Sequence, residues 1–346
     1  MSGIACHSKS QLSDTEIAKR LEGVLGAAEG EGFSGAVLVD RKGKVVLNKG
    51  YGFANRKTSI PVTTETIFLI GSLTKQFTAA AILKLEATRK LRVEDPISKY
   101  LTGVPVDKQK VTVHHLLSHT SGFFSEFSDD DYDPAPRDEV VQRILASKLE
   151  FEPGRKYAYS NAGYLLLAAI VEKISAEPFE EFLERTLFEP AGLTHTGYVG
   201  QESAKGKWAM GYIDSAEWSP LNEPIVPGSW FRRGAGGIFS TAEDLYRWNQ
   251  ALNGESILSN SSKRKLFTPH VAESEDGRSF YGYGWVVGTT GRGTRVVWHN
   301  GSWYAFYAEM RRYLDEEVTV IFLTNTAGEV ADRTRQKLLD ALFAPL

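Results

Sequence analysis

Cysteine is almost missing from this chain: Cys6 is the one cysteine among 346 residues. A single cysteine cannot form an internal disulfide, and it has no second thiol with which to build a cysteine-based zinc site. Long hydrophobic runs are missing as well. Because no run of about 18 apolar residues occurs, we expect no transmembrane segment. These absences exclude disulfide-stapled and membrane-spanning proteins as interpretations of the sequence.

An excess of charge of one sign is also lacking. The sequence has 40 lysine and arginine residues against 43 aspartate and glutamate residues, for a net charge of -3. A nucleic-acid-binding protein normally needs a basic face or stripe, so we expect no nucleic-acid partner. The remaining composition, 42% hydrophobic and 24% charged, is typical of a globular protein with one large domain or two smaller ones.

The first residues lack the basic start and the apolar stretch of a signal peptide. From the sequence as written we therefore expect a cytoplasmic protein. Cys6 leaves an alternative open, because it follows small and apolar residues as in a lipoprotein cleavage site. If a leader before Cys6 has been removed, the protein would be periplasmic or lipid-anchored.

Strand patterns occur near both ends of the chain, and helical patterns dominate between them. Residues 35–54 contain two β-rich runs around a turn at 41–44, which predicts a hairpin. Asp14 and Thr15 are candidate caps of the first helix, and Ser240 with Glu243 fits a capping box. The expected helices are 14–28, 77–91, 138–149, 162–175, 242–252 and 329–343, and the expected later strands are 281–287, 294–300, 304–313 and 316–325.

These patterns predict an α+β fold. An antiparallel sheet flanked by helices would be built from both chain ends, and the middle would form a mostly helical inserted lobe. We assign residues 1–59 and 270–346 to the α/β sheet domain and residues 60–269 to the mostly helical domain. Because clefts between lobes often hold active sites, we expect the active site at their junction.

The first candidate for chemistry is the pair Ser72 and Lys75. Their spacing places both side chains on one face of a helix, about one turn apart. A hydroxyl is a weak nucleophile that needs a base nearby, and a lysine supplies one when burial lowers its pKa. Ser262 and Lys265 have the same spacing, but they lie in a polar run that predicts a solvated helix start, whereas Ser72 lies between apolar segments.

The second candidate is the pair Tyr159 and Asn161. A phenol beside a lysine can transfer protons between nucleophile and leaving group, and an asparagine side chain can hold a substrate amide. The alternative is a turn and cap before the 162–175 helix, because serine and asparagine suit helix caps.

The third candidate is the segment from His299 through Gly301 to Ser302. Asn-Gly is typical of a hairpin turn, so one interpretation is a tight turn between two strands. The functional alternative places these residues at a strand edge that lines the cleft. His299 would then supply a polar or cationic contact, and the backbone N–H groups of Ser302 and Ser72 would form an oxyanion hole.

Together the three motifs give the chain a clear family resemblance. It resembles the serine β-lactamase and penicillin-binding protein superfamily on its class C side, which includes class C β-lactamases, D-Ala-D-Ala carboxypeptidases, D-aminopeptidases and related esterases. The resemblance extends from about residue 15 to the end of the chain and includes the segments 116–123 and 234–248. It implies a β-lactamase/transpeptidase-like fold.

The resemblance also implies an acyl-enzyme mechanism. Ser72 would attack the substrate carbonyl, Lys75 and Tyr159 would share the proton transfers, and Asn161 would orient the acyl side. Which of the two bases acts first stays open, because coupled groups titrate as a pair. No metal or organic cofactor is implied, since serine, lysine and tyrosine suffice for acyl transfer.

The third motif departs from the pattern of specialised class C β-lactamases, which have a lysine where this chain has His299. A neutral imidazole holds a carboxylate less well than an ammonium group does. We therefore expect a peptidase, amidase or esterase acting on a small molecule or a short peptide. A β-lactamase, or a binding or assembly protein that retained the fold without turnover, remain alternatives. The oligomeric state is not predicted.

Two further groups of residues flank the motifs. Arg232 and Arg233 are candidates for the missing positive charge or, alternatively, surface residues. Four aromatic residues predict either an aromatic rim for apolar acyl groups or a part of the core: Phe123, Phe124, Trp303 and Tyr304.

Overall fold

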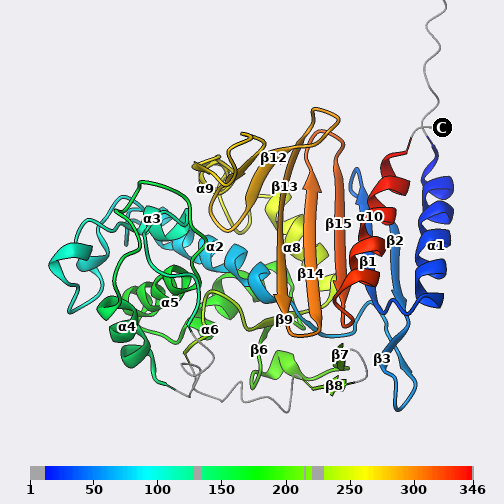
Figure 1. The fold of residues 1–346 in the computed structure, drawn as a ribbon, viewed down its shortest axis with the longest axis horizontal. Coiled ribbons are helices and arrows are strands. Elements are labelled where there is room, and N and C mark those ends of the chain that lie inside the picture. Colours follow the sequence, from blue (N-terminus) through cyan, green and yellow to red (C-terminus); the bar gives the residue numbers. More distant parts are fainter. Residues whose placement is uncertain (1–11, 128–134, 214–215, 220–229, 345–346) are drawn as a thin grey trace, which may run out of the picture.

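The computed structural model describes residues 12–127, 135–213, 216–219 and 230–344. Within them, eight strands form one antiparallel sheet in the order β10-β11-β12-β13-β14-β15-β1-β2 (Figure 1). The strands are β1 (Gly35–Arg41), β2 (Lys44–Tyr51), β10 (Val271–Ala272), β11 (Ser279–Tyr281), β12 (Val286–Thr289), β13 (Arg295–Trp303), β14 (Phe306–Tyr313) and β15 (Val318–Thr324). The predicted sheet built from both chain ends is confirmed, because β1 pairs with β15 along its whole length.

The hairpin β1–β2 turns where the sequence predicted it. Lys42 and Gly43 both have positive φ, 55° and 77°. Two such residues give a turn whose twist matches that of the strands it connects. The predicted strand 281–287 was wrong as a single strand, because residues 282–285 form the bend that joins β11 to β12. Apolar residues continue through that bend, so hydrophobicity alone does not reveal it.

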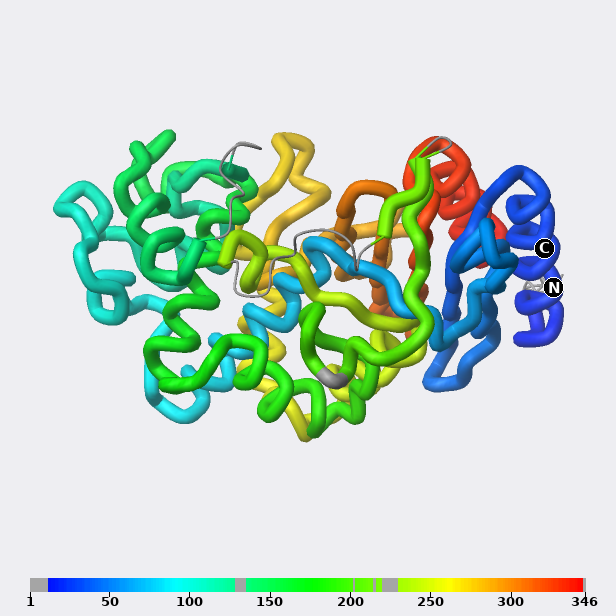
Figure 2. Tube along the Cα trace, turned by 90° about the horizontal axis from the view of Figure 1, so that it is seen from below, coloured from blue at the N-terminus to red at the C-terminus, as the bar shows by residue number. Residues whose placement is uncertain are grey.

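Each face of the sheet has its own hydrophobic core. Successive side chains of a strand point to opposite faces, and β1 follows this rule: Val37 and Val39 join one core, whereas Ala36 and Leu38 join the other. The helices α1 (Asp14–Gly30) and α10 (Glu329–Phe343) pack against each other over the first face, and α8 (Ala242–Asn253) packs on β1 and β15 at the second. Figure 2 shows α1 in blue and α10 in red at one end of the molecule.

Both predicted helix caps were wrong by one or two residues. Ser13 caps α1: its Oγ accepts the N–H of Glu16, while the Glu16 carboxylate accepts the Ser13 N–H. Asp14 instead forms ion pairs from the first turn of α1 with the two ends of the β1–β2 turn. Thr241 caps α8 by accepting the N–H of Asp244, because the chain is still extended at residue 240, where the strand β9 (Ile238–Ser240) ends.

The middle of the chain is mostly helical, at the left of Figure 1. Its helices are α2 (Thr74–Ala87), α3 (Val113–Leu117), α4 (Arg137–Ala146), α5 (Asn161–Ser175), α6 (Phe179–Leu183), α7 (Glu189–Ala191) and α9 (Asn260–Leu266). A short sheet of β5 (Phe68–Leu69), β9 (Ile238–Ser240) and β6 (Gly197–Tyr198) contacts the large sheet where β5 packs against β14. The division into domains at residues 59/60 and 269/270 remains a prediction.

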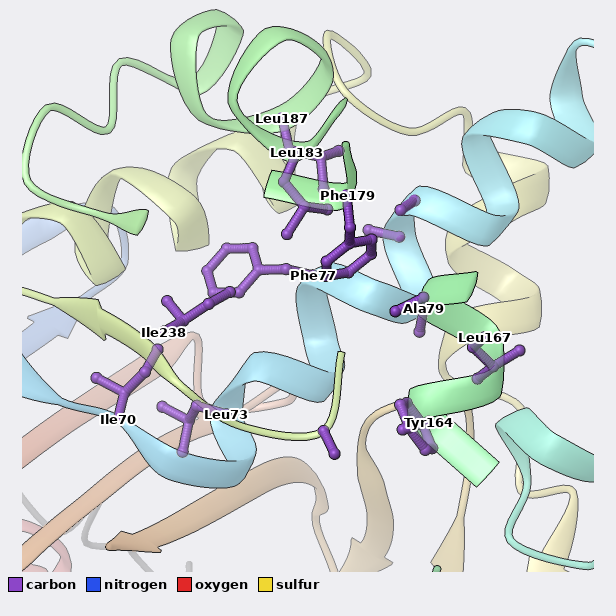
Figure 3. Close-up of a cluster of buried hydrophobic side chains, with 14 of the residues drawn as sticks. Ile70, Leu73, Phe77, Ala79, Tyr164, Leu167, Phe179, Leu183, Leu187 and Ile238 are labelled. Atoms are coloured by element: carbon purple, nitrogen blue, oxygen red, sulfur yellow. The ribbon is translucent and has the colours of Figure 1, made fainter. Parts of the chain in front are cut away.

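The helix α2 lies at the centre of the middle part. The residues of its first three turns are all buried, including the polar side chains of Thr74, Lys75 and Gln76. Figure 3 shows Phe77 of α2 beside Phe179 of α6, within a cluster of apolar side chains from several elements. The predicted start of this helix at residue 77 was three residues late, because its first turn is polar in sequence. Among the described residues, none of the helices has the length and apolar content needed to cross a membrane.

Candidate active site

Ser72 lies in the short helix η1 (Gly71–Leu73), directly before α2. Every other residue from 67 to 83 is buried, whereas Ser72 is partly exposed. Ile70 and Leu73 on either side point into the core with Ile238 (Figure 3). The apolar neighbours therefore hold the backbone of η1 against the core and leave the Ser72 hydroxyl facing a cleft.

Lys75 is fully buried, and its ammonium nitrogen is next to Ser72. Nζ lies 3.1 Å from Ser72 Oγ, 2.6 Å from Asn161 Oδ1 and 2.7 Å from the carbonyl oxygen of Ala235. The last two oxygens can only accept hydrogen bonds, so Nζ donates to both. A neutral amine has two N–H bonds and one lone pair, which leaves the lone pair for the Ser72 O–H. Burial places the pKa of Lys75 well below its ordinary value, which favours this neutral form.

The carbonyl of Ala235 is held on Lys75 by its neighbours. Thr78 Oγ1 donates to the Gly234 carbonyl oxygen at 2.7 Å, and Thr74 Oγ1 accepts the Ile238 N–H at 3.3 Å. Two threonines of α2 therefore attach the glycine-rich segment on both sides of Ala235. The sequence resemblance included this segment but did not indicate that its backbone contacts the lysine.

Tyr159 lies immediately before Ser160, the N-cap of α5. Burial raises the pKa of the Tyr159 phenol above its ordinary value, and a hydrogen bond to Ser72 partly opposes that shift. Lys75 Nζ lies 4.7 Å from the centre of the Tyr159 ring. The predicted residues Ser72, Lys75 and Tyr159 are thus brought together, and the phenol is protonated near neutral pH.

Asn161, the first residue of α5, connects Lys75 to a residue that the sequence analysis missed. Its Oδ1 accepts from Lys75, and its Nδ2 donates to Glu126 Oε1 at 2.6 Å. The backbone N–H of Asn161 donates to the Ser125 carbonyl oxygen at 2.7 Å, which joins the segment of Glu126 to the start of the helix. No local pattern marks Glu126, because it lies in a segment without regular secondary structure.

Gly301 and Ser302 lie inside β13 and not in a tight turn, so the strand-edge alternative is the observed one. β13 and η1 approach each other so closely that each has a glycine at the point of contact. A Cβ atom at Gly301 would lie 2.1 Å from the Ile70 carbonyl oxygen, and one at Gly71, whose φ is +50°, would lie 2.8 Å from Ser302 N. The backbone of Ser302 therefore faces the Gly71–Ser72 segment.

His299, also in β13, is buried with both ring nitrogens engaged. Its Nδ1 donates to the Asn300 carbonyl oxygen at 2.6 Å, so its Nε2 accepts from the Tyr281 hydroxyl at 3.0 Å. Burial, and to a smaller extent the charge of Lys75 when that lysine is protonated, lowers the pKa of His299 to about 3. The ring is therefore neutral near pH 7, which favours the polar contact over the cationic one that was its alternative.

His119 is a second residue whose place in the site the sequence analysis missed. Its Nδ1 accepts the Ser160 N–H at 3.0 Å, and its carbonyl oxygen accepts the Ala158 N–H at 2.9 Å. Its ring lies 4.3 Å from the Tyr159 ring, centre to centre. His119 thus contacts Tyr159 and both of its chain neighbours. The sequence did contain a signal, since His119 belongs to the segment 116–123 that shares the family resemblance.

The cleft beside Ser72 has an aromatic lining that differs in part from the predicted one. The lining includes Phe127, Phe231 and Trp303. Phe123 is buried in the core, and Tyr304 is exposed and stacked on Trp218. Of the four predicted aromatic residues, the described lining contains only Trp303.

The two arginines differ in their surroundings, and neither is a plain surface residue. The Arg232 guanidinium lies 3.4 Å from the centre of the Trp303 ring and lines the cleft. Arg233 forms an ion pair with Glu180 at 2.9 Å and is largely buried. Among the described residues that line the cleft, Arg232 is therefore the one with a positive charge.

The second serine–lysine pair lies outside this cleft. Ser262 is in the first turn of α9, where Ser259 is the cap, and Lys265 forms an ion pair with Glu86 at 2.8 Å. The helix start is confirmed, but Ser262 is buried and not solvated. Across the described ranges there is no group of three or more His, Cys, Asp or Glu side chains that could hold a metal ion. That the reaction needs no cofactor remains a prediction. Cys6 lies outside the described residues.

Comparison with known proteins places this chain in a family. The family model described as Beta-lactamase matches residues 17–344. Penicillin-binding protein 4* of Bacillus subtilis (strain 168) is 32% identical over 313 residues, which are 85% of this chain and 68% of that protein. The teichoic acid D-alanine hydrolase of Staphylococcus aureus (strain MRSA252) is 28% identical over 239 residues, 69% of this chain and 57% of that protein.

A solved structure agrees with these matches. The octameric penicillin-binding protein homologue from Pyrococcus abyssi has a TM-score of 0.81 and 28% sequence identity, and the match covers 94% of this chain and 77% of that chain. The chain belongs to the beta-lactamase family, a family of serine hydrolases, and it has the β-lactamase and penicillin-binding-protein fold.

Proposed function

We propose that this chain cleaves an ester or amide bond through an acyl-enzyme on Ser72, with Lys75 as the base that activates the hydroxyl. The contact between Lys75 Nζ and Ser72 Oγ, at 3.1 Å, carries the proposal. Burial and two carbonyl acceptors favour a neutral lysine whose lone pair is directed at that hydroxyl. An amine in this state is a suitable general base near neutral pH.

The proposed reaction begins when Ser72 Oγ attacks the substrate carbonyl carbon and its proton passes to Lys75. The backbone N–H groups of Ser72 and Ser302 stabilise the oxyanion, which the close approach of β13 to η1 supports. Tyr159 transfers a proton to the leaving group as the bond to the acyl carbon breaks, and protonated Lys75 returns a proton to the phenolate. Water then attacks the acyl-enzyme, which releases the acid and restores the Ser72 hydroxyl.

We favour an esterase, amidase or peptidase over an efficient β-lactamase. The neutral His299 ring cannot provide the ammonium that lysine provides to a substrate carboxylate in specialised class C enzymes. Two relatives support this preference, since one is a penicillin-binding protein and the other a D-alanine hydrolase. Small acyl groups on oxygen or nitrogen are thus the proposed substrates.

A fluorophosphonate probe and a chromogenic short-chain ester test this proposal. The wild-type protein and the Ser72→Ala variant are incubated with both, and the probe adduct is located by mass spectrometry. We expect the adduct on Ser72 and a loss of ester turnover in the variant. An adduct elsewhere, or a well-folded wild type without adduct or turnover, contradicts the proposal. The latter result would favour the binding or assembly role.

A chromogenic cephalosporin, assayed beside the ester, tests the β-lactamase alternative. We expect a kcat/KM for the cephalosporin at least 100-fold below that for the ester. A cephalosporin value equal to or above the ester value would make β-lactam hydrolysis the function. The Ser72→Ala variant serves as the blank for both substrates.

A further inference from the structure

Glu126 is a carboxylate in the active-site cleft that the proposed mechanism does not use. It lines the same cleft as Ser72 and Asn161, and it is the one acidic residue in the described lining. The side chain is exposed, and within the described part of the chain it forms no ion pair. A carboxylate in this position is available to a charged part of the substrate.

The position of Glu126 relative to the nucleophile follows from Asn161. One end of the Asn161 amide accepts from Lys75 and the other donates to Glu126. Glu126 therefore lies across the Asn161 amide from Lys75, beside the residue to which the family resemblance assigns the acyl part of the substrate. A carboxylate has about four lone-pair sites, and the bond from Asn161 occupies one of them.

We propose that Glu126 binds an ammonium group carried by the acyl part of the substrate, so that the preferred substrates are aminoacyl esters or amides with a free amino group. This inference rests on the proposed Ser72 acyl-enzyme. An ammonium group presents three donors, and its hydrogen bonds to a carboxylate are charge-assisted. The other charged group in the described lining, Arg232, is stacked on Trp303 and would repel an ammonium placed beside it.

Binding of the ammonium group at Glu126 also affects Lys75, the proposed general base. The negative charge of Glu126 raises the pKa of Lys75, against the larger effect of burial. A substrate ammonium neutralises that charge, so it removes the stabilisation that Glu126 gives to protonated Lys75. The substrate itself thereby favours the neutral, reactive lysine. A neutral acyl donor does not have this effect.

Two methyl esters that share a leaving group and a size test the proposal. Alanine methyl ester carries an ammonium group where methyl lactate carries a hydroxyl, and both enantiomers of each are assayed. We expect wild-type kcat/KM to be at least tenfold higher for the alanine ester. Glu126→Gln retains the oxygen that accepts from Asn161 but removes the charge. It should lower the ratio of kcat/KM for the alanine ester to that for the lactate ester at least tenfold, and the lactate value should stay equal or rise, because loss of the charge also favours neutral Lys75.

Two controls accompany this comparison. Glu275→Gln, an exposed change outside the cleft lining, should behave as wild type, and Glu126→Asp should retain part of the preference. The wild-type preference should also decrease as pH rises through the pKa of the substrate amine, about 8. This decrease in the preference follows from deprotonation of the substrate amine. A merely structural role of Glu126 would not produce it.

Equal losses on both esters in Glu126→Gln would overturn the proposal and leave Glu126 as a positioning residue for Asn161. Ser72-dependent turnover without a preference for the alanine ester in the wild type would overturn it too, while the acyl-enzyme proposal stands. If neither ester shows turnover that Ser72→Ala abolishes, both proposals fail together.

Discussion

Lys75 shows how the surroundings of one residue change its chemistry. An exposed lysine is protonated near neutral pH and cannot accept a proton from a serine. Here the side chain is completely buried among α2, α5 and the glycine-rich segment, which removes the water that would stabilise its charge. Two carbonyl oxygens orient its N–H bonds, so the lone pair faces Ser72. Burial keeps the amine neutral, so that its lone pair can accept a proton, and the hydrogen bonds set its direction.

Replacing Lys75 by methionine retains an apolar stem of similar length and removes the amine. We expect kcat/KM on the short-chain ester to fall by about 10²–10⁴-fold, the range attributed to a positioned general base. The chain offers a matched control in Lys265→Met, a lysine at the same spacing from a serine but outside the cleft. Equal activity of both variants would refute the assigned role of Lys75.

The pH dependence of turnover provides a second test at this site. Lys75 acts in its neutral form, so kcat/KM should rise with pH and level off above the pKa of Lys75. Because burial lowers that pKa, the midpoint should lie well below the ordinary value of 10.5. Among the described residues, the other titratable groups near Lys75 are Glu126, Tyr159, Tyr164, His119 and His299. A midpoint near 10.5 would show that the lysine is not desolvated in solution.

At the scale of elements, the site depends on a strand edge lying directly against a helix start. β13 pairs with β12 as far as Trp298. Beyond Trp298 the same edge of β13 lies against η1, with Gly301 and Ser302 at the contact. This contact brings a backbone amide of the large sheet to the nucleophile at the start of α2. The hairpin β13–β14 turns at Tyr304, where φ is +48°, three residues beyond Gly301.

Gly301→Ala tests this contact, because the added methyl group would lie 2.1 Å from the Ile70 carbonyl oxygen. The strand must then move away from η1, and the Ser302 amide moves with it. We expect kcat/KM to fall by about 10²-fold or more, as for loss of an oxyanion-hole donor. Gly291→Ala, with open space around its Cβ position, is the control. Wild-type kinetics in Gly301→Ala would mean that this edge does not contribute to catalysis.

The stability of α2 is a separate matter from its chemistry. Phe77 is fully buried, and its ring lies 4.8 Å from that of Trp248 and 5.3 Å from that of Phe188, centre to centre. Phe77→Ala should lower the free energy of unfolding by about 3–5 kcal/mol, the usual cost of such a cavity. Urea denaturation measures the change, with the half-exposed Phe53→Ala as control. A loss no larger than that of the control would contradict the packing described for α2.

At the scale of the whole molecule, a buried neutral histidine links stability to pH. The pKa of His299 is about 3 in the folded protein, whereas an unfolded chain has the ordinary value near 6.5. Between these values the unfolded chain binds the proton and the folded protein does not, so stability is lost as pH falls through that window. The loss is about 1.4 kcal/mol per pH unit for each such group, up to about 5 kcal/mol for His299.

Comparison of the wild type with His299→Asn isolates this contribution. Other buried histidines, among them His119, add to the slope in both proteins. We therefore expect the free energy of unfolding, measured by denaturant titration from pH 7 to pH 3.5, to decrease less steeply in the variant. Parallel slopes would show that His299 titrates normally. Because the test compares slopes against pH, a constant difference in the free energy of unfolding between variant and wild type does not affect it.

Sequence pattern alone was sufficient for much of the architecture. Runs of strand-forming residues predicted the β1–β2 hairpin and β13–β15, helical spacing predicted α1, and length with apolar composition predicted α5, because these elements bury one face or both against a continuous core. The bend inside 281–287 and the polar start of α2 were missed, since apolar content does not separate a bend from a strand and a buried polar turn resembles a loop.

The candidate site also has a part that the sequence predicted and a part that only the structure revealed. Short spacings indicated Ser72 and Lys75, and the motif order indicated Tyr159, Asn161 and His299, because reactive groups of this kind occur in local patterns that the sequence carries by itself. Only the tertiary structure brought Glu126 to Asn161, the Ala235 carbonyl to Lys75 and β13 to η1. These contacts join segments that are far apart in the chain, and burial, which sets both the basicity of Lys75 and the neutrality of His299, exists only once those segments are packed together.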